Sequence, residues 1–340
     1  MSAGGDCGRF GSVCRLFGLT AGENRVRATF WLLDAPDSLE VQSHRNVDGA
    51  GLGYFGPDGG VVLDKQPEPA FRDQEFQRAA RQVESSAFVA HVRWATAGGR
   101  TMRNTHPFGM KGRVMAHNGG FGSLAQLEAE LGPYADLVLG DTDSERYFAL
   151  ITKETDAHGG DVGAGIAAAA SWIGARLPVS SLNVVVAAPG ELWALRYPDQ
   201  HALHILERRS DGGLHVRSAT SSVHAPDLAD AASVVVASEE LDGESGWRML
   251  APGELAHVRR DLSVESWIAV PEPPAHLVPL PPGSPNIDTL YVSPRSIGLA
   301  EKRRPRVVTG QVTPAMDLDD ELTERNRPPT ASHESGNIKG

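Results

Sequence analysis

The stretch CRLFG at residues 14–18 decides the fold, because a cysteine there leads directly into apolar sequence. Three polar strings follow it: HVRWATAGG at 91–99, HNGG at 117–120 and GDTDSE at 140–145. A fixed cation and a fixed anion would hold the two charged ends of a free amino acid. An amide and a backbone N–H beside a thiol would stabilise the oxyanion that forms when an acyl group is attacked. The four segments therefore predict a glutamine amidase.

These four motifs, in this order, resemble those of the class II glutamine amidotransferases, which are N-terminal-nucleophile (Ntn) hydrolases. The resemblance covers residues 14–256 and is strongest to stand-alone members that begin Cys-Arg-Leu-Phe/Leu-Gly, such as the ergothioneine-pathway γ-glutamyl hydrolases. It implies an α+β fold, a four-layer αββα Ntn-hydrolase sandwich. Ala97 stands where many synthase-linked relatives carry His, and we interpret it as a mark of the subfamily.

The resemblance also implies a role for each polar residue of the motifs. Cys14 would be the nucleophile, and Asn118 with Gly119 would form the oxyanion hole. Arg93 would bind the α-carboxylate of the substrate, and Asp143 its α-amino group. Glutamine or another γ-glutamyl amide is therefore the expected substrate.

Three further residues could line the substrate pocket. The resemblance implies that Trp94 and Thr96 shape the pocket around the Arg93 side chain. His106 could also line it, although an interior, hydrogen-bonded histidine is the alternative. Asp141 and Asp143 form a D-x-D pair that could bind a metal, but with no phosphate or nucleotide-sugar motif nearby we predict amine recognition and no metal or cofactor.

The position of Cys14 inside the chain conflicts with an Ntn mechanism. Such an enzyme needs the free α-amino group of its nucleophile, whose ordinary pKa of about 7.7–8.0 makes it the nearest general base. Residues 1–13 would therefore be a short leader removed by cleavage, or the product of a mis-assigned start. Val13 favours the second explanation, because a GTG codon reads as Val internally and as Met when it begins a chain.

Cys7 is the alternative nucleophile, but no strand-like sequence continues from it as it does from Cys14. The other possibilities for the two cysteines are a buried core thiol, a disulfide and a zinc site. Two cysteines in 340 residues, without a secretion signal, indicate a reducing, cytoplasmic environment. The spacing of the two matches no common zinc pattern.

Composition agrees with an enzyme that has a large core. The chain has 340 residues, is 41% hydrophobic and carries a formal charge of −11. This acidic balance gives no electrostatic footprint for nucleic acid. The longest apolar candidate, residues 162–175, is rich in Ala and Gly, so it predicts a buried helix and no membrane span.

Periodicity predicts the elements of two sheets and their covering helices. The predicted helices are 75–85, 124–131, 145–152 and 162–175, the third capped by Asp143 or Ser144. The predicted strands are 25–33, 51–55, 61–63, 88–94, 113–117, 182–187, 192–197, 201–206, 215–218, 233–237 and 254–258.

Two other segments of the sequence bear on function. The G-x-G-x-x-G pattern at 51–56 runs into a turn at 57–60 instead of opening a helix, so it predicts a hairpin and no dinucleotide site. After the amidotransferase domain at 14–270, seven prolines fall within 271–285, and the polar sequence continues to the end. We predict that 271–340 is a proline-rich, mostly disordered tail.

No acceptor domain that would consume ammonia is visible in the sequence. Three functions therefore stay open: a glutaminase that feeds a separate synthase subunit, a hydrolase of a γ-glutamyl conjugate, and a non-catalytic binding protein that retains the fold. The clamp of Arg93 and Asp143 reads only the glutamyl half of a substrate, so it does not decide between the first two.

Overall fold

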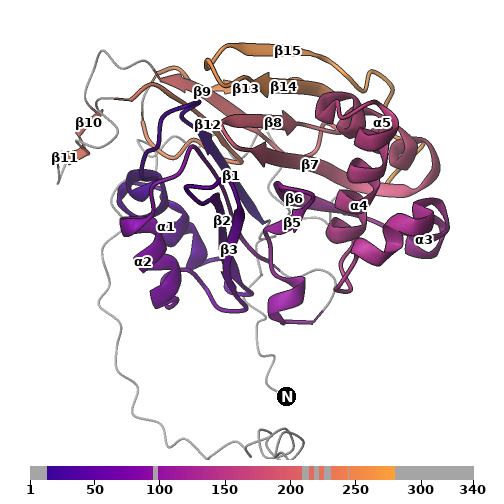
Figure 1. Cartoon of the computed structure of the whole chain (residues 1–340), viewed down its shortest axis with the longest axis horizontal. Coiled ribbons are helices and arrows are strands. Elements are labelled where there is room, and N and C mark those ends of the chain that lie inside the picture. Colours follow the sequence, from indigo (N-terminus) through magenta and orange to yellow (C-terminus); the bar gives the residue numbers. More distant parts are fainter. Residues whose placement is uncertain are drawn as a thin grey trace, which may run out of the picture. The chain divides into compact units, whose positions relative to one another are not determined.

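The computed structural model describes residues 14–94, 99–208, 214–217, 222–225, 231–243 and 245–279. In this part of the chain two β-sheets lie face to face, and helices cover the outer face of each (Figure 1). The predicted α+β fold, a four-layer αββα sandwich, is therefore confirmed. Residues 1–13 with Cys7, residues 95–98 with Ala97, and residues 280–340 of the predicted disordered tail (271–340) lie outside the described residues. Residues 271–279 are described, and His276 and Leu277 pair with the strand at Pro178 and Val179, so the ordered part extends beyond the predicted boundary at 270.

The first sheet places Cys14 at its centre. β1 (Arg15–Thr20) begins directly after Cys14 and pairs antiparallel with β4 on one side and β12 on the other. Both neighbours are buried strands rich in Val and Ala, as expected for the middle of a sheet. In spatial order the strands are β13 (Arg248–Met249), β9 (His204–Arg208), β12 (Ser233–Ala237), β1, β4 (Ala87–Val92), β2 (Ala50–Phe55) and β3 (Val61–Gln66).

The second sheet carries the asparagine motif on β6. Its strands, in spatial order, are β15 (Val264–Ile268), β14 (Glu254–Val258), β8 (Glu191–Leu195), β7 (Pro178–Ala188), β6 (Arg113–Phe121) and β5 (Phe108–Met110). The short strand β16 (His276–Leu277) adds to β7 in parallel. A separate hairpin pairs β10 (Leu214–Arg217) with β11 (Ser222–Ala225).

Helices cover the outer faces of both sheets. Against the first sheet pack η1 (Phe30–Asp34), α1 (Leu39–Ser43) and α2 (Gln74–Gln82). Against the second pack α4 (Asp143–Ala157) and α5 (Val162–Arg176), with α3 (Leu124–Leu131) and η3 (Gly132–Leu137) beside α4. The single turn η2 (Met102–Asn104) precedes β5.

Three apolar layers hold the sandwich together, one in each space between adjacent layers. Leu16 of β1 and Val114 of β6 meet in the middle layer, between the sheets. Because side chains alternate along a strand, residues two positions further along face the same way. Cys14 and Asn118 therefore share the inward orientation of Leu16 and Val114, which directs both toward the space between the sheets.

Most of the predicted elements are confirmed, with two corrections. Residues 25–33 are not a strand: the run enters η1, where Phe30, Trp31 and Leu32 are all buried. A short continuous apolar run does not distinguish a buried strand from a buried helical turn, which is why the prediction was wrong. The cap of α4 is Thr142, whose hydroxyl accepts from the Glu145 N–H at 3.2 Å, and is neither Asp143 nor Ser144.

The glycines of the 51–56 pattern serve packing within β2. A Cβ on Gly51 would lie 2.2 Å from the backbone oxygen of His106, so only glycine lets the 105–107 segment approach the strand. β2 and β3 form the predicted hairpin. The 51–56 pattern therefore lies in a strand of a hairpin and does not open a helix.

Candidate active site

The Cys14 thiol is held by the backbone of the neighbouring strand. Its Sγ lies 3.2 Å from the carbonyl oxygen of Trp94 and 3.2 Å from the Trp94 backbone nitrogen. Trp94 follows β4, the antiparallel partner of β1, so the pairing of the two strands sets the position of the thiol. Cys14 is a free cysteine and partly buried.

Burial raises the pKa of the Cys14 thiol above its ordinary value. The hydrogen bond from Trp94 and the positive charges of Arg93 and Arg15 oppose this effect, while the carboxylate of Asp143 adds to it. The thiol is therefore protonated at neutral pH. Since the thiolate is the nucleophilic form, this cysteine needs a nearby base to react.

Arg93 lies at the end of β4, beside the nucleophile. Its Nη1 donates to the carbonyl oxygen of Gly99 at 3.1 Å, and its backbone nitrogen donates to the carbonyl oxygen of Gly49 at 2.7 Å. Asp48 returns a backbone hydrogen bond to Arg93 at 3.1 Å. Burial lowers the pKa of Arg93, and Cys14 and Asp143 oppose this shift. An arginine remains charged at neutral pH even so, which makes it a fixed cation next to the thiol.

The second sheet contributes Asn118 and Gly119 from β6. Asn118 is buried, yet its side-chain amide makes no hydrogen bond to any residue within the described part of the chain. Its backbone oxygen accepts from the Ser181 hydroxyl at 3.1 Å. Gly119 has φ +153°, and a Cβ there would lie 2.0 Å from the Ser181 carbonyl oxygen. Only glycine fits this position, and the amide beside it is available to a ligand.

Asp143 sits in the first turn of α4 with its carboxylate fixed from two directions. Oδ1 accepts from the backbone nitrogen of Ser144 at 2.9 Å, and Oδ2 accepts from that of Phe121 at 3.2 Å. The helix N-terminus stabilises this negative charge. The negative charge of Asp143 raises the pKa values of both Cys14 and Arg93.

The remaining predicted residues have different environments. Trp94 holds the thiol through its backbone, and Thr96 lies outside the described residues. His106 is buried and stacks on His91, with ring centroids 4.2 Å apart, and against Phe108 at 4.7 Å. A role of His106 in substrate binding stays a prediction. The structure thus brings Cys14, Arg93 and Asp143 into one site. The Asn118 side chain faces the space between the two sheets, as Cys14 does.

Asn104 is a site residue that was not predicted from the sequence, and it connects Gly99 with Asp141. Its Nδ2 lies 3.3 Å from both the Gly99 carbonyl oxygen, which also binds Arg93, and the Asp141 carboxylate. Its Oδ1 accepts from the backbone nitrogen of Asp141 at 2.9 Å. Asp141 therefore supports a loop, and Asp143 alone of this pair turns to the site. No local sequence signal distinguishes Asn104 from an ordinary turn asparagine.

Among the described residues, no three His, Cys, Asp or Glu side chains are grouped so that they could hold a metal ion. Nor does this part of the chain contain a helix long and apolar enough to cross a membrane.

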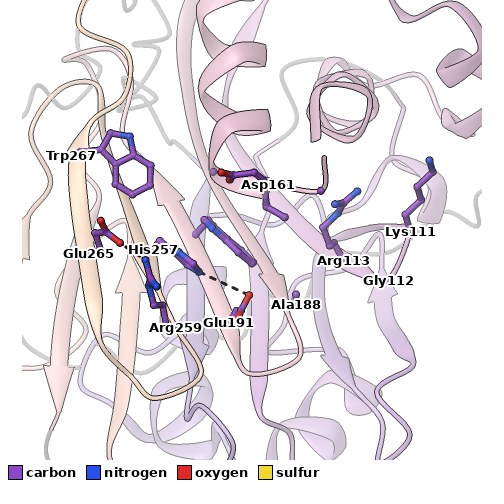
Figure 2. Close-up of a pocket in the computed structure, with 14 residues that line it drawn as sticks. Lys111, Gly112, Arg113, Asp161, Ala188, Glu191, His257, Arg259, Glu265 and Trp267 are labelled. Carbon is purple, nitrogen blue, oxygen red and sulfur yellow. Dashed lines mark hydrogen bonds and ion pairs between the residues drawn. The ribbon is translucent and has the colours of Figure 1, made fainter. Parts of the chain in front are cut away.

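A surface groove of about 650 Å³ lies at the far end of the second sheet (Figure 2). None of the predicted site residues lines it. Its lining includes the stacked pair of Trp193 and His257, with ring centroids 4.6 Å apart. Arg259 and Glu265, which also line it, form an ion pair at 2.5 Å.

The comparisons with known proteins identify the family of the chain. The family model "Glutamine amidotransferases class-II" matches residues 13–276. The chain therefore belongs to the class II glutamine amidotransferase family, which confirms the resemblance. A search of the curated proteins finds no match.

Solved structures share the fold at low sequence identity. A class-II domain protein from Silicibacter pomeroyi, titled a glutamine aminotransferase, is 18% identical, with a TM-score of 0.52 over 76% of this chain and 100% of its own. The glutamine phosphoribosylpyrophosphate amidotransferase of B. subtilis is 19% identical, with a TM-score of 0.54 over 76% of this chain and 50% of its own. The chain thus spans half of the length of that enzyme. At these identities the likeness extends to the fold alone.

Proposed function

We propose that this protein hydrolyses the γ-amide of glutamine or of a γ-glutamyl conjugate through a thioester on Cys14. One observation carries the proposal: a fixed thiol lies beside a fixed cation, Arg93, and within the electrostatic influence of a fixed anion, Asp143. This arrangement matches the two charged ends of a free amino acid. The unpartnered amide of Asn118 supplies a donor for an oxyanion.

The chemistry follows in balanced steps. Arg93 binds the α-carboxylate and Asp143 the α-ammonium group, so that the γ-carbonyl carbon lies over the Cys14 sulfur. The sulfur attacks that carbon, and Asn118 with the Gly119 N–H stabilises the oxyanion. The C–N bond breaks, and the amine leaves with the proton taken from the thiol. Water then cleaves the thioester, releases the glutamyl product as a carboxylic acid and returns the proton to sulfur.

The base in this scheme is the α-amino group of Cys14. Burial keeps the thiol protonated at neutral pH, so a group with a pKa near 7.7–8.0 adjacent to it is well suited to remove the proton. This requires that residues 1–13 are absent from the active protein. Arg93 and Arg15 do not replace this base, because an arginine is always protonated.

The test is an assay of the purified full-length gene product, with its amino terminus followed by intact-mass analysis. We expect hydrolysis of glutamine or a γ-glutamyl anilide only by protein that begins at Cys14. Asn118→Ala should lower the turnover number by about 10²–10³-fold with little change in KM. Activity in protein that still carries residues 1–13 would contradict the mechanism.

A matched control comes from the strand next to β6. Asn183 pairs with Asn118 across β6 and β7, but its side chain is fully used by the Tyr197 backbone nitrogen and by the carbonyls of His201 and Ala202. Asn183→Ala should lower the thermal midpoint and leave the turnover number of the folded protein nearly unchanged.

A further inference from the structure

A buried chain of polar contacts runs from the Asp143 carboxylate to the neighbouring strand β7. The Ser144 hydroxyl oxygen lies 3.3 Å from Asp143 Oδ1 and 2.9 Å from His117 Nδ1. The opposite ring nitrogen, His117 Nε2, lies 3.1 Å from the carbonyl oxygen of Ser181. All four residues are buried, so no bulk water competes for these contacts.

The chemistry of the partners fixes the direction of each hydrogen bond. A carbonyl oxygen only accepts, so His117 Nε2 must carry a hydrogen. Burial lowers the pKa of His117, against the opposing effect of Asp143, so the ring is neutral at pH 7. Nδ1 is then the unprotonated nitrogen, and it accepts the single hydrogen of the Ser144 hydroxyl.

This orientation decides what Asp143 can bind. The Ser144 hydroxyl has one hydrogen, so a hydroxyl that donates to His117 does not also donate to Asp143 Oδ1. Within the described residues, the carboxylate then accepts only from the backbone nitrogens of Ser144 and Phe121. A carboxylate has about four acceptor sites, so it keeps capacity for an ammonium group.

The same series of polar contacts also reaches β6, the strand that carries Asn118 and Gly119. The carbonyl oxygen of Ser181, which accepts from His117, is the atom that a Cβ on Gly119 would strike. The hydroxyl of Ser181 donates to the Asn118 carbonyl oxygen at 3.1 Å. His117 is thus connected to the amino-group end of the site on one side and to the Asn118–Gly119 strand on the other.

We propose that His117 is a positioning residue that takes the Ser144 hydroxyl hydrogen and thereby keeps Asp143 open to the α-ammonium group of the substrate. This inference rests on the proposed function, because it assigns Asp143 to a γ-glutamyl amino group. Without the imidazole, the hydroxyl turns toward Asp143 Oδ1 and competes with the ammonium group. His117 would therefore favour substrates that carry an α-amino group.

The experiment compares two substrates that differ only in that group: glutamine, and glutaramate, which retains the carboxylate and the amide. The measured quantity is the ratio of kcat/KM for glutamine to that for glutaramate. His117→Gln should lower this ratio about tenfold. The introduced side-chain amide still donates to the Ser181 carbonyl, but the Ser144 hydroxyl loses the imidazole nitrogen that accepted its hydrogen. Ser144→Ala alone should change the ratio less than about threefold, since the competing hydroxyl is gone.

The double variant gives the decisive result. His117→Gln with Ser144→Ala should restore the ratio to within about threefold of the wild-type value, because the hydroxyl that competes is absent. A merely structural role of His117 predicts the opposite, an added loss for both substrates alike. Thr152→Val is the control, since it removes another buried hydroxyl from α4, and it should leave the ratio unchanged.

Other outcomes have equally definite meanings. An unchanged ratio in folded His117→Gln, or a loss that the double variant retains, would overturn the proposal. If wild-type protein beginning at Cys14 hydrolyses no γ-glutamyl amide, the proposed function fails instead. In that case, and if His117→Gln does not fold, nitrogen-15 NMR of the wild-type imidazole still tests the hydrogen-bond assignment: a hydrogen on Nε2 is expected, and one on Nδ1 would overturn it.

Discussion

The two ends of β6 each lie near a glycine with positive φ and a buried arginine, but the surroundings of these residues differ. At the far end, Arg113 follows a turn at Gly112, which has φ +73°. At the near end, Gly119 has φ +153° and follows Asn118, which faces the same inter-sheet space as Cys14. The buried cation beside Cys14, Arg93, comes from the end of β4 in the other sheet. The ends of the nine-residue strand β6 lie roughly 26 Å apart. Each therefore has a left-handed glycine and a buried arginine, but only one has a nucleophile.

The two ends also differ in which polar groups are available to a ligand. The groove at the far end is a hollow of about 650 Å³, and two of its charged residues, Arg259 and Glu265, pair with each other. At the near end, the amide of Asn118 has no partner among the described residues, and Asp143 keeps acceptor capacity. An open, oriented polar group beside a nucleophile indicates chemistry better than the size of a hollow does.

The largest difference should come from placing a methyl group on each glycine. In Gly119→Ala, the new Cβ meets the Ser181 carbonyl oxygen, so the strand must move and the oxyanion donors move with it. We expect turnover to fall by about 10²–10³-fold and stability by a few kcal/mol. Glutamine hydrolysis and urea unfolding measure the two effects.

Gly112→Ala is the matched control for that change. No atom lies within 4 Å of a Cβ built there, so only the left-handed backbone is penalised, by about 1–2 kcal/mol. Turnover should stay within about twofold of the wild-type value. Equal losses of turnover in the two variants would show that the near end of β6 has no special part in the reaction.

The second comparison replaces the two buried arginines. Arg93→Gln removes the cation beside Cys14, and we expect kcat/KM for glutamine to fall by about 10²-fold, mainly through KM. Arg113 has its Nε and Nη2 buried without a hydrogen-bond partner among the described residues, so Arg113→Gln should change neither constant more than about twofold. A larger effect of Arg113→Gln on either constant would show that the far end of β6 influences catalysis or substrate binding.

The smallest expected effect is on stability at mild acidity. Burial lowers the pKa of His91 to about 3 in the folded protein, whereas an unfolded histidine titrates near 6.5. Because the folded pKa is the lower one, its contribution is fully present above about pH 6.5 and is lost as pH falls toward 3. At pH 5.5 the folded state should be less stable by about 1.4 kcal/mol through this residue.

Urea unfolding at pH 7.5 and 5.5 would measure this loss. His91→Gln should reduce the difference between the two pH values by about 1 kcal/mol. His257 at the far end is only partly buried, and burial lowers its pKa too, so His257→Gln should reduce the difference less. A larger reduction from His257→Gln than from His91→Gln would contradict the stronger lowering of the His91 pKa by burial.

Much of this molecule was predictable from local pattern. The predicted helix at 124–131 coincides with α3, and the hairpin at 57–60 joins β2 to β3. Such elements follow from side-chain periodicity and turn residues, which are local properties. The strand predicted at 25–33 was wrong because the three consecutive buried residues Phe30, Trp31 and Leu32 have no strand period, and their packing decided the helical conformation.

The sequence by itself determined the family and the chemical types in the site, because the thiol, the cation, the amide and the carboxylate stand in four recognisable motifs. Only the tertiary structure decided how these groups are oriented. Trp94 holds Cys14 from 80 residues away, and His117 meets Ser181 across 64 residues. The physical reason is that hydrogen-bond direction depends on which groups share a buried space, and the pairing of distant strands creates that space.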